Sequence, residues 1–266
     1  MLLHRPFVYF ICEVNEMYIL SVDITAKTAT AALSEVRNNV VCPLCDAHLH
    51  STLTHSESIL PMIDFCLKNA NVSLSNVEVF AISAGPGSFT GVRIGIATIK
   101  GLAFGNDDVK CVPVSALESL AENVSDEQRG TVICAIMDAR RNQFYNALFS
   151  ANGKGSIKRL TDDRAIDGDE LFFELREKYA SHKIILVGDG ALLAYKLFSV
   201  QQGFESMKIL LPRSDRLLQD AVSVARCAYR NMDKSIPSEK LNPVYLRLSQ
   251  AERERNERME KCELSK

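Results

Sequence analysis

The 266-residue sequence contains no tryptophan, and only 7% of its residues are aromatic. Proteins that bind single-stranded nucleic acid stack the bases on aromatic side chains, so we expect no base-stacking surface here. The sequence also lacks an excess of basic residues, because 31 lysines and arginines stand against 33 aspartates and glutamates. Binding to nucleic-acid phosphates requires clustered positive charge. The composition therefore gives no electrostatic argument for direct RNA binding.

Long hydrophobic runs are absent too, since no stretch reaches the roughly 20 apolar residues that a membrane span requires. The first 16 residues are largely apolar, but Arg5 and Pro6 interrupt them and no small-residue cleavage site follows. Because Met17 directly precedes the first predicted strand, we expect residues 1–16 to be either a dispensable extension or the product of an upstream start. The eight cysteines are scattered and favour reduced thiols in the cytoplasm.

Length and composition indicate a folded protein of one large or two small domains, with 47% hydrophobic and 24% charged residues. Each half of the sequence begins with strand-like segments and continues with alternating helices and strands, which predicts two similarly built α/β lobes. The polar segment 125–130 separates them. We therefore expect a first lobe over residues 17–129, a second over 130–248, and a charged, solvated tail over 249–266.

The periodicity of apolar residues predicts the individual elements. Strands are expected over residues 18–24, 28–34, 36–53 (with a turn at Asn38 and Asn39), 77–83, 110–114, 132–137, 144–149 and 184–187. Helices are expected over residues 54–70, 88–104, 169–179 and 217–232, and two more should begin near residues 115 and 191. Pro61 should kink the first helix or move its start to a later residue.

The most informative segment is Ala84-Gly-Pro-Gly-Ser-Phe-Thr-Gly-Val-Arg-Ile-Gly95, between a strand and a helix. Gly87, Gly91 and Gly95 share one helical face, and a glycine inside a helix costs about 1 kcal/mol relative to alanine. That face is a groove without side chains, so something must pack closely against it. A neighbouring helix, a partner subunit and a phosphate at the helix N-terminus are the candidates.

Three enzyme motifs resemble this segment but do not fit it. A dinucleotide fingerprint has the spacing G-x-G-x-x-G and an acidic residue at the next strand end, and both are missing. A nucleophile elbow places serine between two glycines as G-x-S-x-G, whereas Ser88 is displaced by one residue and is typical of a helix N-cap. The Gly-Lys-Ser/Thr of a Walker A loop does not occur in the sequence.

Metal-ligand residue types occur together at Cys42, Cys45, His48 and His50. On a strand, however, the two cysteines would point to opposite faces, which disfavours zinc. His55 has no second histidine four residues later, so a helical two-histidine site is excluded. We predict no metal site.

Asp23 and Asp138 end equivalent strands of the two halves, each before a tight turn. Such a pair is compatible with two lobes that hold a nucleotide, with Thr25 in the first turn. Phosphate-binding turns usually contain glycine, which neither turn has. The two carboxylates are at least as well explained as turn or cap residues.

Six segments occur in the order found in the TsaB (YeaZ) family, and the sequence resembles that family over about residues 17–247. They are Ile19-Leu-Ser-Val-Asp23, His55-Ser-Glu with Leu60-Pro-Met-Ile63, Ala84–Ala103, Val114-Ser-Ala-Leu-Glu118, Met137-Asp-Ala-Arg140 and Pro243-Val-Tyr-Leu-Arg247. The first 16 residues and the pair Cys42 and Cys45 are not part of the family pattern.

The resemblance implies an actin/Hsp70-like (ASKHA) two-lobe α/β fold in which each lobe is a mixed sheet flanked by helices. It implies a non-catalytic subunit for threonylcarbamoyl transfer to adenosine 37 of tRNAs that read codons beginning with A. The implied partners are the related catalytic subunit TsaD and the ATPase TsaE. Without them the protein is expected to form a homodimer, and tRNA is expected to bind through the complex rather than directly. The partner contacts map to residues 54–70 and 88–104. The resemblance and the bare glycine face together give a predicted interface of His55, Pro61, Gly87, Gly91, Arg93 and Gly95.

The sequence leaves two other functions open. A kinase or phosphotransferase of the same fold would use Asp23 and Asp138, and a redox or zinc module would use Cys42 and Cys45. We expect no catalytic residue and no tightly bound cofactor. Weak nucleotide binding between lobes or subunits, at Asp23, Thr25 and Asp138, stays open.

Overall fold

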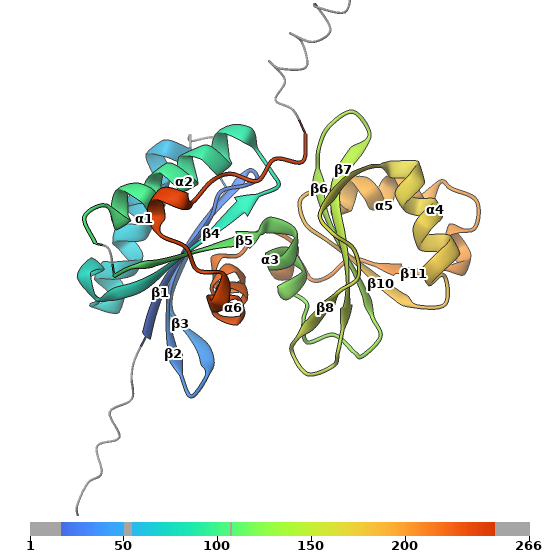
Figure 1. The fold of residues 1–266 in the computed structure, drawn as a ribbon. Coiled ribbons are helices and arrows are strands. Elements are labelled where there is room, and N and C mark those ends of the chain that lie inside the picture. Colours follow the sequence, from blue (N-terminus) through green and yellow to red (C-terminus); the bar gives the residue numbers. More distant parts are fainter. Residues whose placement is uncertain (1–16, 51–54, 107, 248–266) are drawn as a thin grey trace, which may run out of the picture.

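The computed structural model describes residues 17–50, 55–106 and 108–247, which form two lobes side by side (Figure 1). The predicted extension over residues 1–16 and the predicted tail over 249–266 lie outside the described residues. So does Thr54, the first residue of the expected first helix.

The first lobe contains a five-stranded mixed sheet in the order β3-β2-β1-β4-β5. Its strands are β1 (Met17–Asp23), β2 (Thr28–Arg37), β3 (Val40–His50), β4 (Val77–Gly85) and β5 (Lys110–Ser115). The first three form an antiparallel meander, and Asn38 and Asn39 make the predicted turn between β2 and β3 with left-handed backbone angles. Strand β4 runs parallel to β1, and β5 runs parallel to β4.

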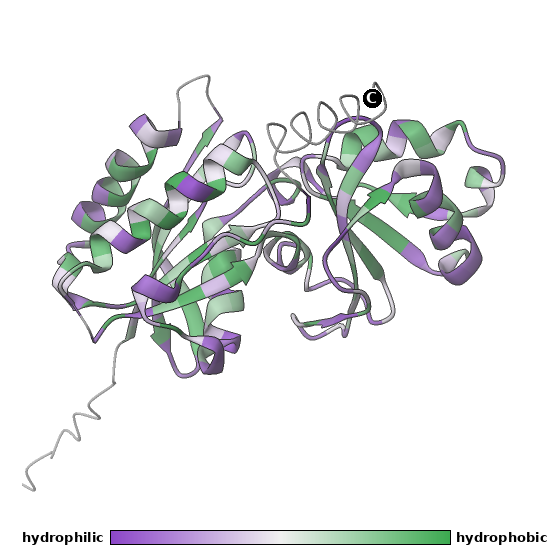
Figure 2. Ribbon diagram, turned by 45° about the horizontal axis from the view of Figure 1, so that its top comes forward, coloured by the Kyte–Doolittle hydropathy of each residue, from purple (hydrophilic) through white to green (hydrophobic). Residues whose placement is uncertain are grey.

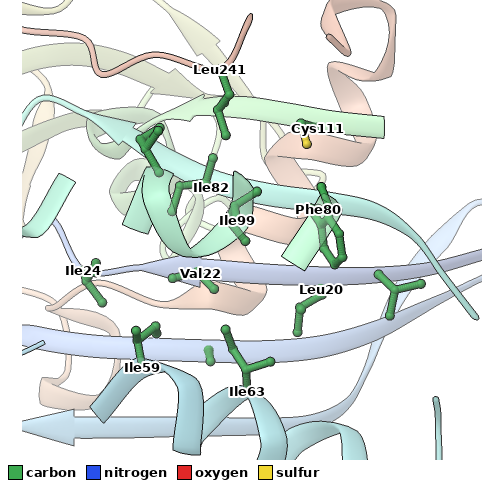
Figure 3. Close-up of a cluster of buried hydrophobic side chains, with 14 of the residues drawn as sticks. Leu20, Val22, Ile24, Ile59, Ile63, Phe80, Ile82, Ile99, Cys111 and Leu241 are labelled. Carbon is green, nitrogen blue, oxygen red and sulfur yellow. The ribbon is translucent and has the colours of Figure 1, made fainter. Parts of the chain in front are cut away.

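Helices cover both faces of this sheet. On one face α1 (His55–Ala70) and α2 (Phe89–Ala103) bury the largest hydrophobic cluster of the lobe, in which Val22, Ile63 and Ile82 are inaccessible or nearly so (Figure 3). On the other face α6 (Ala221–Arg230) packs against β1, β4 and β5. The outer surfaces of the helices are more polar than the strands between them (Figure 2).

The second lobe repeats the plan with a six-stranded sheet in the order β11-β10-β6-β7-β8, and β9 pairs with β7. Its strands are β6 (Val132–Asp138), β7 (Gln143–Ala151), β8 (Ile157–Arg159), β9 (Arg164–Asp167), β10 (Lys183–Val187) and β11 (Lys208–Leu210). Helices α4 (Gly168–Tyr179) and α5 (Ala191–Ser199) cover one face, and α3 (Ala116–Glu122) covers the other. Short 3-10 helices lie at Leu74–Asn76, Phe204–Ser206, Ser214–Arg216, Met232–Lys234 and Ser238–Lys240.

The helices predicted to begin near residues 88 and 115 have capped N-termini. The Ser88 hydroxyl accepts a hydrogen bond of 3.2 Å from the Gly91 amide, and the Ser115 hydroxyl accepts one of the same length from the Glu118 amide. Each side chain satisfies an amide that the first helical turn leaves without a partner. Helix α1 begins at His55, so Pro61 does not move its start to a later residue.

Two expectations about the end of the chain are wrong. The last helix begins at Ala221 rather than near residue 217, because Asp220 caps it by accepting a 2.8 Å hydrogen bond from the Val222 amide. The expected second lobe includes the residues after 220, yet α6 packs on the first-lobe sheet. The apolar face of α6 therefore completes the first lobe.

Helix α3 joins the lobes. The Ser115 hydroxyl donates to Asp163 over 2.5 Å, and Arg159 of the second lobe lies 3.2 Å from Glu118. The two mixed sheets with their flanking helices form the actin/Hsp70-like two-lobe fold. Among the described helices, none is both long and apolar enough to cross a membrane.

Candidate partner surface and interlobe cleft

The glycine face of α2 packs against its own chain, so the expectation that it receives another protein is wrong. A β-carbon at Gly91 would lie 2.1 Å from the Ile24 carbonyl oxygen, and one at Gly87 would lie 2.4 Å from the Thr25 carbonyl oxygen. At Gly95 the neighbours are side chains, with Ile82 Cδ1 at 2.9 Å. The three glycines let α2 approach the end of β1, and this contact is internal to the first lobe.

The other predicted interface residues lie in three different environments. His55 is half-buried, and its Nε2 lies 2.7 Å from the Ala26 carbonyl oxygen, with which it shares a hydrogen bond. Arg93 is exposed on α2, but its Nε donates over 2.8 Å to the hydroxyl of Tyr245. Pro61 is exposed on α1 between apolar neighbours. Of the six residues, Pro61 alone presents an exposed apolar side chain.

Exposed apolar side chains surround Pro61, and we call Leu60, Pro61 and Phe65 the α1 surface. Half of Leu60 and half of Phe65 are accessible, at 51% and 50%. A hollow of about 320 Å³ separates α1 from β3, lined by Ala47, Leu49, Glu57, Ser58, Pro61, Met62 and Phe65. A larger hollow of about 750 Å³ lies on the other side of α1 and is lined in part by Leu60, Leu67 and Leu102. A helix with an apolar ridge between two hollows is typical of a protein-binding surface.

The interlobe cleft is a cavity of about 490 Å³ lined by both lobes. The first lobe contributes Thr25, Ala26, Lys27, His55, Gly87, Ser88, Phe89 and Thr90, and the rest of the chain contributes Met137, Asp138, Ala139, Arg140, Tyr145, Asp189 and Arg247. The structure therefore brings Thr25 and Asp138 to one cavity, as the nucleotide hypothesis expects. Asp23 is fully buried behind it and does not line it.

Hydrogen bonds occupy both carboxylates of the predicted pair. Asp23 accepts from the Thr25 amide over 2.9 Å, from the Thr25 hydroxyl over 2.6 Å and from the Ser83 hydroxyl over 2.5 Å. Burial raises the pKa of Asp23, although the hydrogen bonds from Ser83 and Thr25 oppose this shift. Asp138 is exposed and accepts from the Arg140 amide over 2.7 Å. Each aspartate binds the amide two residues later, which is the geometry of a turn-forming carboxylate.

Asp189 is a cleft residue that the sequence reasoning missed. Burial, and then the negative charge of Asp138, raise the pKa of Asp189 to about 6. One of its carboxylate oxygens, Oδ1, is buried with no hydrogen-bond partner among the described residues. The sequence Gly188-Asp-Gly190 indicates a turn, and the carboxylate between two glycines at a strand end is the signal that points to the cleft.

The cysteine and histidine segment lies on β3, where three of its side chains have local partners. His48 Nε2 is 3.2 Å from an Asp46 carboxylate oxygen, and His50 Nδ1 is 3.2 Å from the Thr28 hydroxyl. The Cys42 thiol donates weakly to the Val40 carbonyl oxygen over 3.8 Å. Within residues 17–50, 55–106 and 108–247, no three histidine, cysteine or acidic side chains form a cluster that could hold a metal ion.

Comparison with known proteins identifies the family. The family model described as TsaD, tRNA N6-adenosine threonylcarbamoyltransferase, matches residues 50–253. The tRNA threonylcarbamoyladenosine biosynthesis protein TsaB of Escherichia coli K12 is 30% identical over 234 residues, which are 87% of this chain and 95% of that protein. The TsaB of Bacillus subtilis 168 is 30% identical over 162 residues, 61% of this chain and 67% of that protein.

A solved structure agrees with these sequence matches. The crystal structure of a Pseudomonas aeruginosa protein, described as similar to the peptidase YEAZ, has a TM-score of 0.68 and 25% identity, and the match covers 87% of this chain and all of that one. Sequence, family model and fold therefore lead to one assignment. The chain belongs to the TsaB (YeaZ) family.

Proposed function

We propose that this protein is a non-catalytic subunit for the synthesis of threonylcarbamoyladenosine in tRNA. In this role it pairs with a TsaD-like catalytic subunit that transfers threonylcarbamoyl to adenosine 37. The observation that carries the proposal is the match to a TsaB over 87% of this chain and 95% of that protein. The match to the TsaD family model supports the choice of partner, because related chains with the same fold can pair through equivalent surfaces.

The partner-binding surface in this proposal is the outer face of α1 together with the neighbouring end of α2. The α1 surface supplies Leu60, Pro61 and Phe65, and Phe104 at the end of α2 is 89% exposed. Large apolar side chains next to hollows are the anchors that dominate protein–protein affinity. The proposal does not depend on the glycine face, which the first lobe fills itself.

The complex accounts for the remaining partners. In this proposal the TsaE-like ATPase acts on the paired subunits, and tRNA is bound through the complex, because this chain has no overall basic charge. Without its partner, the chain forms a homodimer through the same α1 surface. The phosphotransferase alternative is less well supported, since internal hydrogen bonds already occupy both oxygens of Asp23.

The test is a titration of the purified TsaD-like subunit from the same organism with wild-type protein and with the double variant Leu60→Lys/Phe65→Lys. Two lysine ammonium groups buried in the interface should weaken the affinity of pairing by on the order of 100-fold, the size of an interface hot spot. The matched control is Val200→Lys, at an 81% exposed apolar residue after α5 of the second lobe. Circular dichroism checks the fold of each variant. Equal affinity of the folded double variant and the wild type would refute the α1 surface.

A further inference from the structure

A segment after α6 runs back across the first lobe and reaches the second, and we call residues 236–247 the strap (Figure 1). Its first residue, Ile236, forms an antiparallel bridge with Cys111 at the free edge of β5. Leu241 is fully buried in the core beneath α2. The Val244 amide then donates to the Ala84 carbonyl oxygen over 2.8 Å. The strap is therefore an integral part of the first lobe up to Val244.

The turn before α2 is shaped to receive the strap. Gly85 has a φ of +121°, and a β-carbon at this residue would lie 2.4 Å from the Val244 carbonyl oxygen. Both the backbone angle and the space require glycine at this position. The glycine motif thus admits two close neighbours, the end of β1 at Gly91 and the strap at Gly85.

Tyr245 fixes the strap to the surface of α2. Its ring stacks on Phe89 with the centroids 4.0 Å apart and the planes 2° from parallel. Arg93 donates to the Tyr245 hydroxyl over 2.8 Å, and its guanidinium lies 4.9 Å from the centre of the Phe89 ring. Tyr245 nevertheless stays 39% exposed, so its open edge is accessible to a protein bound along the first turns of α2.

Two residues later the strap crosses to the second lobe. Arg247 Nη1 donates over 2.7 Å to the carbonyl oxygen of Ala139, in the turn between β6 and β7. Arg140, Arg141 and Asn142 in the same turn have left-handed backbone angles, with φ of 62°, 56° and 58°. A turn with three such non-glycine residues is costly, so it depends on the contacts that hold it. Arg247 also lines the interlobe cleft beside this turn.

From these contacts we infer that Tyr245 and Arg247 form a clasp that couples partner binding on α2 to the turn beside the interlobe cleft. The inference rests on the proposed function, and it extends the partner-binding face from the Phe104 end of α2 to the first turns of α2, where Phe89 and Arg93 contact Tyr245. A partner that covers Tyr245 holds the strap in place, which keeps Arg247 on Ala139 and steadies the β6–β7 turn. By thermodynamic linkage, the factor by which partner binding stabilises the clasp equals the factor by which the clasp strengthens partner binding. Loss of the clasp therefore weakens partner binding by that factor.

The first part of the test uses the protein alone and measures hydrogen–deuterium exchange at residues 138–143. Three amides of this turn donate hydrogen bonds within it. The Ala139 amide donates to the Gln143 carbonyl oxygen, the Arg140 amide to the Asp138 carboxylate, and the Gln143 amide to the Arg140 carbonyl oxygen. Arg247→Met keeps the aliphatic stem and removes the guanidinium, and it should speed exchange in this turn about tenfold, the effect of losing one charged hydrogen bond. Tyr245→Ala should do the same, and Tyr245→Phe, which keeps the stacked ring, should do so less.

Matched controls remove similar contacts that do not join the lobes. Arg176 Nη1 donates over 2.9 Å to the Gln202 carbonyl oxygen within the second lobe, so Arg176→Met should leave the turn unchanged. The Tyr229 hydroxyl donates to Asn39 over 3.0 Å within the first lobe, so Tyr229→Ala should leave it unchanged too. Equal exchange at residues 138–143 in wild type and Arg247→Met would overturn the clasp without any partner present.

The second part adds the TsaD-like subunit. Binding should slow exchange at residues 138–143 of the wild type several-fold, and Arg247→Met should bind more weakly and lose this slowing. Slowing that persists in Arg247→Met, or that never occurs although the wild type binds, would contradict the coupling. If the wild type does not bind the TsaD-like subunit, the proposed function fails, while the exchange of the isolated variants still decides whether the clasp exists.

Discussion

Gly91 lies where α2 touches the end of β1, and its missing side chain sets how close the two elements come. A β-carbon there would meet the Ile24 carbonyl oxygen at 2.1 Å, a backbone atom that cannot rotate away. A glycine inside a helix is less stable than alanine, and that cost is offset only where the absent side chain admits a close neighbour. Gly101 is in the same helix but has no close neighbour, because a β-carbon at Gly101 would have nothing within 4 Å beyond the nearby backbone of its own helix.

The pair allows a direct stability test. Gly91→Ala should lower the free energy of unfolding by about 3 kcal/mol, because the backbone must shift to admit the methyl group. Gly101→Ala should raise it by about 0.5–1 kcal/mol through helix propensity alone. Urea denaturation of both variants gives the comparison. A Gly91→Ala variant as stable as the wild type would mean that the contact with Ile24 is not tight.

Asp189 makes stability depend on pH in a direction opposite to that of most carboxylates. Its pKa is raised from 3.8 to about 6, so the folded state binds a proton more tightly than the unfolded state does. The stabilisation by this proton is complete below about pH 4 and is lost as the pH rises through about 6. Asp189→Asn, which stays neutral, should therefore be more stable than the wild type by about 3 kcal/mol at about pH 8 and no more stable at about pH 4. Urea unfolding at both pH values would contradict this if the difference did not change.

At the scale of elements, local signals predicted most helices and strands, and long-range packing decided the rest. Ser88 caps its helix as expected, and Ser115 caps the helix predicted to begin near residue 115, because a cap depends on residues within one turn. The sequence could not show that α6 returns to the first lobe, since an apolar helical face does not specify which sheet it covers. Strands β8, β9 and β11 have three or four residues each, too few for an alternating pattern to be recognised.

The attachment of α6 to α3 is testable through one ion pair. Arg230 donates to both carboxylate oxygens of Glu122, over 3.0 and 2.8 Å, and the Glu122 side chain is only 2% exposed. Arg230→Met leaves this carboxylate buried and unpaired, and should lower the free energy of unfolding by about 3 kcal/mol. The double variant Arg230→Met/Glu122→Leu should regain most of that loss in urea denaturation. An equal loss in the single and double variants would show that packing, not charge, holds α6 there.

At the scale of the whole molecule, the six family segments identified the fold and family, but the site reasoning succeeded only in part. The glycine motif showed that a close neighbour was needed, and its spacing could not show whether that neighbour belonged to the same chain. The neighbours Ile24 and Val244 come from opposite ends of the sequence, so only the folded chain reveals them. The exposed Leu60 and Phe65 were equally hard to foresee, because a helical apolar pattern does not mark which residues stay uncovered.

The central claim is that this chain acts by pairing with a TsaD-like subunit and has no transferase activity of its own. The most direct measurement is reconstituted threonylcarbamoyladenosine synthesis on tRNA, with the TsaD-like and TsaE-like proteins and the enzyme that makes the threonylcarbamoyl donor. Modified adenosine should form only when this protein is added, in proportion to the complex formed, and this protein with tRNA and donor alone should form none. Full modification without this protein, or modification by this protein without the TsaD-like subunit, would contradict the account.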